Sequence, residues 1–190
     1  MLAVRRSTLP DTGDWRYEVK HDGYRILAST VPPALKTRGG ANATGWFPEI
    51  IAAISQLPKG AHILDCEACV LNEIGLADFN RMHARALRRR WYAGADPVTL
   101  CAFDLVVEAG IDIRALPIEE RKARLRALVA GVPGILFVDS DPNGAWLFDA
   151  MRQLKGEGVV AKRVGSPYVA GESNDWVKIK LPVRPGFRRG

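Results

Sequence analysis

The sequence contains little cysteine, no long apolar run and none of the usual phosphate-binding loops. Its three cysteines, an odd and sparse number in 190 residues, exclude a disulfide-stapled secreted fold. No apolar stretch approaches the roughly 20 residues that a membrane-spanning helix needs, and the first residues lack the apolar block of a signal peptide. We therefore expect a cytoplasmic protein that does not contact a membrane.

Neither a GxxxxGK(S/T) loop nor a GxGxxG loop occurs, so a nucleotide would have to be bound in another way. There is also no internal repeat and no low-complexity stretch. The composition, 47% hydrophobic and 25% charged, is typical of a globular protein. Its length predicts that residues 1–190 form a single domain.

The net charge of +6 favours an anionic partner. Clustered arginines are typical of proteins that contact a phosphate backbone, although a solvated helix face and a tail would give the same pattern. Much of the excess lies in two clusters, Arg85/Arg88/Arg89/Arg90 and Arg184/Arg188/Arg189.

Strands and helices alternate irregularly along the chain, which predicts an α+β fold with largely antiparallel sheets flanked by helices. A strand, a His-Asp-Gly turn and a second strand predict a hairpin over 16–30, and proline and glycine predict mostly loop over 31–45. Further strands are expected at 61–72, 98–107, 135–138, 159–164 and 176–180. Helices are expected from Pro48 to Leu57, over 78–92, over 117–129, and after a cap at 139–141, with a tail at 182–190.

The helix at 78–92 should place its apolar residues, Phe79, Met82, Ala86 and Leu87, toward the core. Its arginines should then point outward to the solvent, as on an amphipathic helix.

A lysine ends the first strand of the expected hairpin. Lys20 stands beside the tight Asp22-Gly23 turn and close to Arg25. Neighbouring positive charge favours the neutral amine, which makes Lys20 a candidate nucleophile. A surface turn with a nearby lysine is the alternative.

Asp65 and Glu67 are two residues apart on an expected strand and so project from one face. Adjacent carboxylates repel unless a cation or a hydroxyl donor lies between them, and Mg²⁺ prefers such oxygens. A solvated polar face is the alternative. Cys66 and Cys69 have zinc-like spacing, but residues three apart on a strand point to opposite faces, and no second pair follows. The opposite directions of the two side chains and the lack of a second pair therefore argue against zinc.

Two further segments carry charge at strand ends. Glu157 lies between two glycines ahead of an apolar strand, which suits a ligand or a metal, or simply a helix C-cap and a turn. Simple alternation puts Lys162 on the opposite face from Glu157. Lys178 and Lys180 share one strand face and form either a phosphate clamp or the protected rim of an edge strand. Together, an amine, carboxylates and a lysine pair suit phosphoryl or nucleotidyl transfer.

Five segments in this order resemble the motifs of the covalent nucleotidyltransferases: ATP-dependent DNA ligases, RNA ligases and mRNA capping enzymes. The segment 20–25 resembles motif I (KxDGxR), 65–68 motif III, 103–105 motif IIIa, 157–162 motif IV and 176–180 motif V. The stretches 114–122 and 161–168 are most similar to the adenylation domain of bacterial ATP-dependent DNA ligases of the end-joining type. The resemblance implies the ligase and capping-enzyme adenylation fold, which is ATP-grasp-like.

The resemblance also implies roles. Lys20 would attack the α-phosphate of ATP and hold AMP, Glu18 would contact the adenine edge, and Phe103 would stack on the ring. Glu67 and Glu157 would serve the ribose hydroxyl or a divalent metal, Mg²⁺ or Mn²⁺. Arg25 and Arg38 would lie near the ribose, the phosphates or the DNA end, while Lys178 and Lys180 would grip the α-phosphate, with Asp22, Asp65 and Lys162 in support.

The implied substrate is nicked or broken double-stranded DNA in a bacterial cytoplasm. The chain ends about ten residues after motif V, so we expect no OB-fold domain within it and a separate OB-fold domain or end-joining proteins as partners. Two alternatives remain open: a catalytically impaired nucleic-acid-binding module of the same fold, and an RNA ligase.

Overall fold

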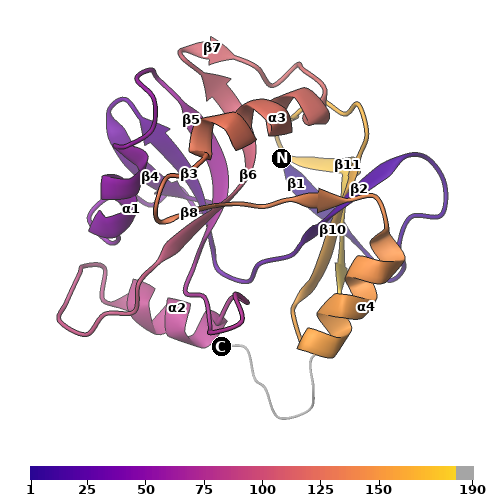
Figure 1. Ribbon diagram of the computed structural model, residues 1–190, viewed down its shortest axis with the longest axis horizontal. Helices are drawn as coiled ribbons and strands as arrows, with labels where there is room; N and C mark the ends of the chain where they lie inside the picture. Colours follow the sequence, from indigo (N-terminus) through magenta and orange to yellow (C-terminus); the bar gives the residue numbers. More distant parts are fainter. Residues whose placement is uncertain (183–190) are drawn as a thin grey trace.

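The computed structural model describes residues 1–182, which form two β-sheets flanked by helices (Figure 1). The first sheet has the strand order β1-β11-β10-β2-β9, in which only β1 and β11 pair in parallel. Its strands are β1 (Leu2–Arg6), β2 (Trp15–Val19), β9 (Ser140–Asp141), β10 (Gly158–Arg163) and β11 (Glu172–Lys180).

The second sheet has the order β4-β3-β5-β6-β7, with β8 pairing in parallel with β6. Its other pairings are antiparallel, so the predicted α+β fold with largely antiparallel sheets is confirmed. Its strands are β3 (Tyr24–Thr30), β4 (Pro33–Thr37), β5 (Ile63–Cys69), β6 (Thr99–Glu108), β7 (Ile111–Asp112) and β8 (Ile135–Phe137).

Each sheet has its own helices and its own core. Against the second sheet pack α1 (Pro48–Ile54), α2 (Phe79–Leu87) and α3 (Ile118–Val129), which bury Ile50, Met82 and Leu125 in the larger core. Against the first sheet packs α4 (Gly144–Leu154), which buries Leu147 and Met151 beside Val159 and Val177. Within residues 1–182, no helix is long and apolar enough to span a membrane.

The expected hairpin over 16–30 is wrong. Both strands exist, but β2 pairs with β10 and β9 while β3 pairs with β4 and β5. The segment from Lys20 to Gly23 therefore crosses from one sheet to the other. The expected loop at 31–45 is also wrong in part, because β4 lies within it and pairs with β3.

Three local expectations are corrected as well. Helix α2 ends at Leu87 and not at residue 92, and Leu87, expected in the core, is 66% exposed. Arg85, expected to face the solvent, is fully buried: its guanidinium stacks on Phe47 and Tyr92 and forms an ion pair with Glu49. Residues 140–141 form β9, and the cap of α4 is Asn143, whose side chain accepts a hydrogen bond from the Trp146 amide. Strand β11 lies between β1 and β10 and so is not an edge strand. The expected tail after Pro182 and its arginines lie outside the described residues.

Candidate active site

A cavity of about 270 Å³ lies where the two sheets meet, and most of the predicted site residues line it. The first sheet contributes β1, β2, β10 and β11 to its wall, and the second contributes β3, β5 and β6. The predicted residues in the wall are Glu18, Lys20, Arg25, Arg38, Glu67, Phe103, Lys162 and Lys178.

Lys20, the candidate nucleophile, is held by Glu157 at the cavity wall. The Lys20 Nζ lies 2.6 Å from Glu157 Oε2, and Lys180 Nζ lies 2.7 Å from Glu157 Oε1. Burial alone would raise the pKa of Glu157, but the two ammonium groups outweigh it and leave that pKa below its ordinary value. Glu157 is therefore an anionic bridge between two lysines, and Lys180 reaches the site through it.

Gly158 explains why simple alternation misplaced Glu157. Its φ of +141° lies in a region that side-chain-bearing residues rarely adopt, and an added Cβ would lie 2.1 Å from the Ile179 carbonyl oxygen. Strand alternation starts only after this residue, so Glu157 turns toward Lys20 while Val160 and Lys162 face the cavity from β10. The turn of the alternative interpretation exists as well, since Lys155 ends α4 with a left-handed backbone.

Glu18 lies at the floor of the cavity between two lysines. Its Oε1 lies 2.7 Å from Lys122 Nζ, and its Oε2 lies 2.7 Å from Lys162 Nζ. Glu18 is 2% exposed. A carboxylate has about four acceptor sites, so each oxygen can still accept one hydrogen bond from a ligand.

Aromatic rings form the adjacent wall. Lys162 Nζ lies 4.2 Å from the centre of the Trp176 ring and 4.9 Å from that of Phe103, and it donates to the Phe103 carbonyl. The two rings meet edge to face, 6.0 Å apart. Complete burial lowers the pKa of Lys162, although Glu18 opposes the shift. A flat apolar ligand would thus meet two rings above a hydrogen-bonding floor.

Asp65 does not face the cavity with Glu67, and the solvated polar face is wrong for it. Asp65 is fully buried and accepts from Arg25 at 2.9 and 2.5 Å and from the Tyr168 hydroxyl at 2.7 Å. These bonds outweigh burial and raise the pKa of Arg25. Asp65 therefore orients the Arg25 guanidinium, which lies against the Phe103 ring in the cavity wall.

Glu67 faces the cavity and accepts a hydrogen bond of 3.2 Å from the Gly23 amide. Burial raises the pKa of Glu67 to about 7, although Lys20 and Arg25 oppose the shift. Gly23 has to be glycine here, because an added Cβ would lie 2.2 Å from the Ala68 carbonyl oxygen. Asp22 lies in the same turn. The pKa of the Cys69 thiol is raised by a hydrogen bond with Cys101 and by burial, and the negative charge of Asp22 adds to this shift.

Lys178 belongs to a group of positive charges at the cavity. Burial, followed by the charges of Lys20, Arg38 and Lys180, lowers the pKa of Lys178. Arg38 lines the same cavity from the end of the β3–β4 hairpin. Like charges repel one another, and an anion placed among these groups would relieve the repulsion.

The two glutamates are hard oxygen donors of the type that Mg²⁺ prefers. Glu67 is the more accessible of the two, since it lines the cavity. Both Glu157 oxygens already bind ammonium groups, so a metal there would have to displace one lysine.

Sequence reasoning missed the role of Lys122, which binds Glu18 from α3 and also donates to the Val138 carbonyl. A signal was present: Lys122, Leu125 and Val129 recur at helical spacing, so a lysine sits on the apolar face. Trp176, noted only as part of a motif, was missed as a wall of the cavity.

Comparisons with known proteins identify the family of the chain. Residues 1–180 match the family model described as ATP dependent DNA ligase domain. The chain therefore belongs to the family of ATP-dependent DNA ligase domains.

Among its relatives, the multifunctional non-homologous end joining protein LigD of Pseudomonas aeruginosa is 35% identical over 94% of this chain. The chain spans 21% of that protein's length. The DNA ligase-like protein LigB of the Bacillus subtilis prophage SPbeta is 30% identical over 85% of this chain and 59% of its own length.

Among solved structures, the ligase domain of LigD from M. tuberculosis superposes with a TM-score of 0.77 at 28% identity, covering 94% of this chain and 60% of that one. A mycobacterial DNA ligase D described as complexed with ATP and MES gives 0.74 at 27% identity over the same shares. The Chlorella virus DNA ligase-adenylate, at 14% identity, shares the fold with a TM-score of 0.69, covering 94% of this chain and 66% of that one.

Proposed function

We propose that this chain adenylates itself at Lys20 with ATP and passes the AMP on to DNA for joining. The observation that carries the proposal is the position of the Lys20 amine. It lies at one cavity that also offers a carboxylate floor, two aromatic rings and a group of cations. Family membership and the ATP complex described for the related mycobacterial ligase support ATP as the nucleotide.

The adenine is proposed to lie against Phe103 and to donate its exocyclic amine to Glu18, which keeps free acceptor capacity. Lys122 and Lys162 hold the Glu18 carboxylate in place. Phosphate oxygens then fall among the cations of Lys178, Lys180 and Arg38, with Arg25 beside the ribose.

In the proposed step, the Lys20 Nζ forms a bond to the α-phosphorus as the bond from that phosphorus to its bridging oxygen breaks. Pyrophosphate leaves with the electron pair. The ammonium must first lose a proton, and Glu157 Oε2 at 2.6 Å is positioned to accept it. Glu67, together with Glu157 Oε1 once Lys180 is displaced from it, would hold the divalent metal, Mg²⁺ or Mn²⁺, which would supply neutralisation of phosphate charge.

The second part of the proposal is DNA joining. AMP passes to a DNA 5′-phosphate, and a 3′-hydroxyl then displaces it and seals the break. The end-joining relatives and the exposed Arg88, Arg89 and Arg90 support nicked or broken duplex DNA as the substrate. We treat residues 1–190 as one nucleotidyltransferase domain, and we propose that an OB-fold domain or an end-joining protein completes the grip on DNA in the bacterial cytoplasm.

Intact-mass spectrometry after incubation with ATP and Mg²⁺ tests the first step. We expect the mass of one AMP to be added and to map to Lys20 in the peptide digest. Lys20→Ala should abolish the adduct and leave the far-ultraviolet circular dichroism unchanged, while Lys59→Ala, at an exposed site away from the cavity, should be adenylated like the wild type. AMP on another lysine of the Lys20→Ala variant would refute the site assignment.

Parallel reactions separate the alternatives. GTP in place of ATP should give no adduct, because Glu18 accepts the adenine amine, whereas guanine presents an acceptor there. A nicked DNA duplex and a nicked RNA duplex, offered to the pre-adenylated protein, distinguish a DNA ligase from an RNA ligase. Nucleotide and nicked DNA bound without any adduct would instead identify a binding module that has lost turnover.

A further inference from the structure

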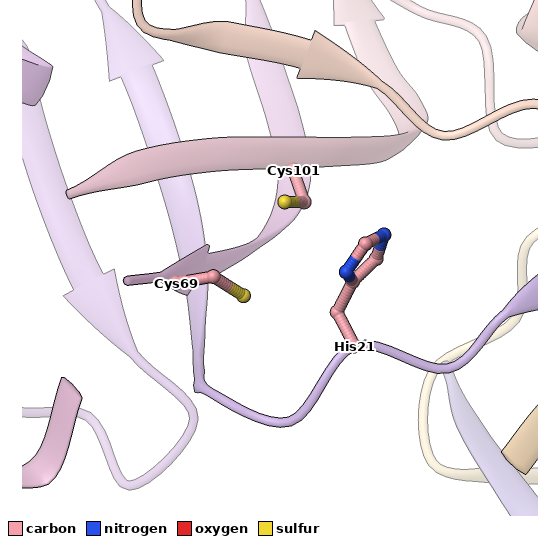
Figure 2. Close-up of side chains that lie close together, drawn as sticks. All are labelled: His21, Cys69 and Cys101. Carbon is pink, nitrogen blue, oxygen red and sulfur yellow. The ribbon is translucent and has the colours of Figure 1, made fainter. Parts of the chain in front are cut away.

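A histidine and two cysteines meet beside the nucleophile segment (Figure 2). His21 follows Lys20 in the crossing between β2 and β3, Cys69 ends β5, and Cys101 lies on β6. Cys69 pairs with Thr99 and Glu67 pairs with Cys101, so the two cysteines are diagonal neighbours on adjacent antiparallel strands. The imidazole and both sulfur atoms face one common space, and their ligand atoms all lie within 4.8 Å of one another.

The imidazole nitrogen is buried without a hydrogen-bond partner. Among residues 1–182, nothing donates to or accepts from His21 Nδ1. A buried polar atom of this kind costs free energy unless something pairs with it. An imidazole nitrogen in need of a partner is a good metal ligand.

We propose that His21, Cys69 and Cys101 form a binding site for a thiophilic divalent cation of the Zn²⁺ type. The spacing of Cys66 and Cys69 argued against zinc, and those two do separate: Cys66 packs into the larger core. The partner of Cys69 is instead Cys101, which lies 32 residues further along the chain and is brought to it by strand pairing.

The donor set and its surroundings select this class of cation. Two thiolates and one imidazole are the three protein ligands of an open zinc site, whereas Mg²⁺ takes oxygen donors. Two thiolates also balance the charge of a divalent cation. The site would then carry no net charge, as its apolar neighbours Leu71, Ala77 and Val138 require. A univalent soft cation would leave a net negative charge buried there.

The distances require only a small contraction. With Zn–S bonds of about 2.3 Å and a Zn–N bond of about 2.0 Å in tetrahedral geometry, the two sulfurs lie about 3.8 Å apart and each lies about 3.5 Å from the nitrogen. In the structure, the imidazole nitrogen and the two sulfur atoms lie within 4.8 Å of one another, so the distances between them would have to shorten by about 1 Å at most. His21 also lines the cavity, which provides an entry path for the cation and room for a fourth ligand such as water.

Occupation of this site would tie the nucleophile segment to the second sheet. His21 is adjacent to Lys20, and Gly23 packs so closely on β5 that an added Cβ would lie 2.8 Å from Cys69 Sγ. A cation here would therefore restrain the Lys20–Gly23 crossing at its centre. It is a separate site from the one proposed for the phosphate-neutralising metal, which uses oxygen donors.

The test uses the untagged full chain, reduced, freed of metal by chelation and without nucleotide. Titration with Co²⁺, a spectroscopic substitute for Zn²⁺, should give thiolate-to-cobalt charge-transfer absorption that saturates at one equivalent, and Zn²⁺ should abolish it. At a Zn²⁺ concentration about 100 times the dissociation constant, the Tm should rise by about 5–10 °C.

Variants locate the ligands. Cys69→Ser and Cys101→Ser should each weaken Co²⁺ binding at least 100-fold, and His21→Ala should weaken it and change the absorption spectrum. The matched control, Cys66→Ala, removes a buried cysteine outside the cluster and should keep full binding. Circular dichroism of each metal-free variant checks that it is folded, and His21→Ala, in a loop, keeps the test decisive if a cysteine variant does not fold.

Three results would overturn the proposal. The first is the absence of saturable Co²⁺ absorption in the reduced wild type. The second is binding that survives in both serine variants. The third is a Cys69–Cys101 disulfide in the protein as purified, combined with no metal uptake after reduction, which would make the pair a redox couple instead.

Discussion

The buried ion pair between Arg121 and Asp104 offers the sharpest test of how the fold positions the site. Both side chains are fully buried, with Nε–Oδ1 at 2.8 Å and Nη2–Oδ2 at 3.0 Å, and Arg121 also donates to the carbonyl of Ser166. Arg121→Met would leave the Asp104 carboxylate buried without its counter-ion. We expect this to reduce the free energy of unfolding by about 3–5 kcal/mol.

Urea unfolding measures the effect. For a dependence on urea of about 2 kcal/mol per molar, the midpoint should fall by about 1.5–2.5 M. Asp104→Leu should cost a similar amount, but the double variant should lose less than the sum of the two, because the second change removes the charge that the first one stranded. Arg114→Met, which breaks an exposed pair with Asp112, should leave the midpoint unchanged.

Additive losses in the double variant would refute the reasoning, since they would mean that each group is stabilised independently of the other. The pair also bears on the site. Arg121 precedes Lys122 on α3, and Asp104 follows Phe103 on β6, so the ion pair aligns two elements that reach the cavity. We therefore expect Arg121→Met to weaken ATP binding as well. Equilibrium dialysis without urea, at a temperature where the variant is folded, would detect this loss.

Three further outcomes are expected. Burial raises the pKa of Glu67 from 4.5 to about 7. Between these pH values the folded state therefore binds more protons than the unfolded state. The resulting contribution to stability is fully present below pH 4.5 and is lost as the pH rises through 7. Glu67→Gln should remove up to about 3 kcal/mol of that pH dependence, and equal slopes for both proteins in urea unfolding from pH 5 to 8 would contradict the assignment. Gly158→Ala should cost about 3 kcal/mol or more in urea unfolding, because its Cβ would meet the Ile179 carbonyl, whereas Gly45→Ala, with open space around it, should be tolerated; a stable Gly158→Ala protein would show that the turn is not constrained. Lys178→Met should slow adduct formation about 100-fold in a quenched time course while Lys59→Met does not, and an unchanged rate would remove Lys178 from the phosphate site.

The elements that local periodicity predicts are those in which one apolar pattern continues along the whole length. Strand β6 is a continuous apolar run, and α3 repeats its apolar residues at helical spacing, so both were predictable to within a residue or two. The resemblance to the nucleotidyltransferase motifs singled out eight residues that line the cavity.

Long-range pairing was not predictable from local signals. A tight turn between two strands has the same sequence pattern whether the strands pair or diverge, and here β10 and β5 take the edges that the hairpin would have used. The burial of Arg85 has the same origin, since Glu49, Phe47 and Tyr92 come from other elements. Likewise, the cluster of His21, Cys69 and Cys101 exists only through the pairing of β5 with β6 and the crossing between the sheets.

The first sheet is discontinuous in the sequence, and this has a consequence for the order of folding. Residues 24–137 supply the second sheet, whereas the first is assembled from residues 2–19 and 140–180. Its last strand, β11, pairs with the preceding strand β10 and also with β1 at the other end of the chain, and the pairing with β1 closes a very large loop. On the ribosome, the second sheet can therefore form early, while the cavity, whose wall includes Trp176 and Lys178, is completed only when nearly all of the chain described here has emerged.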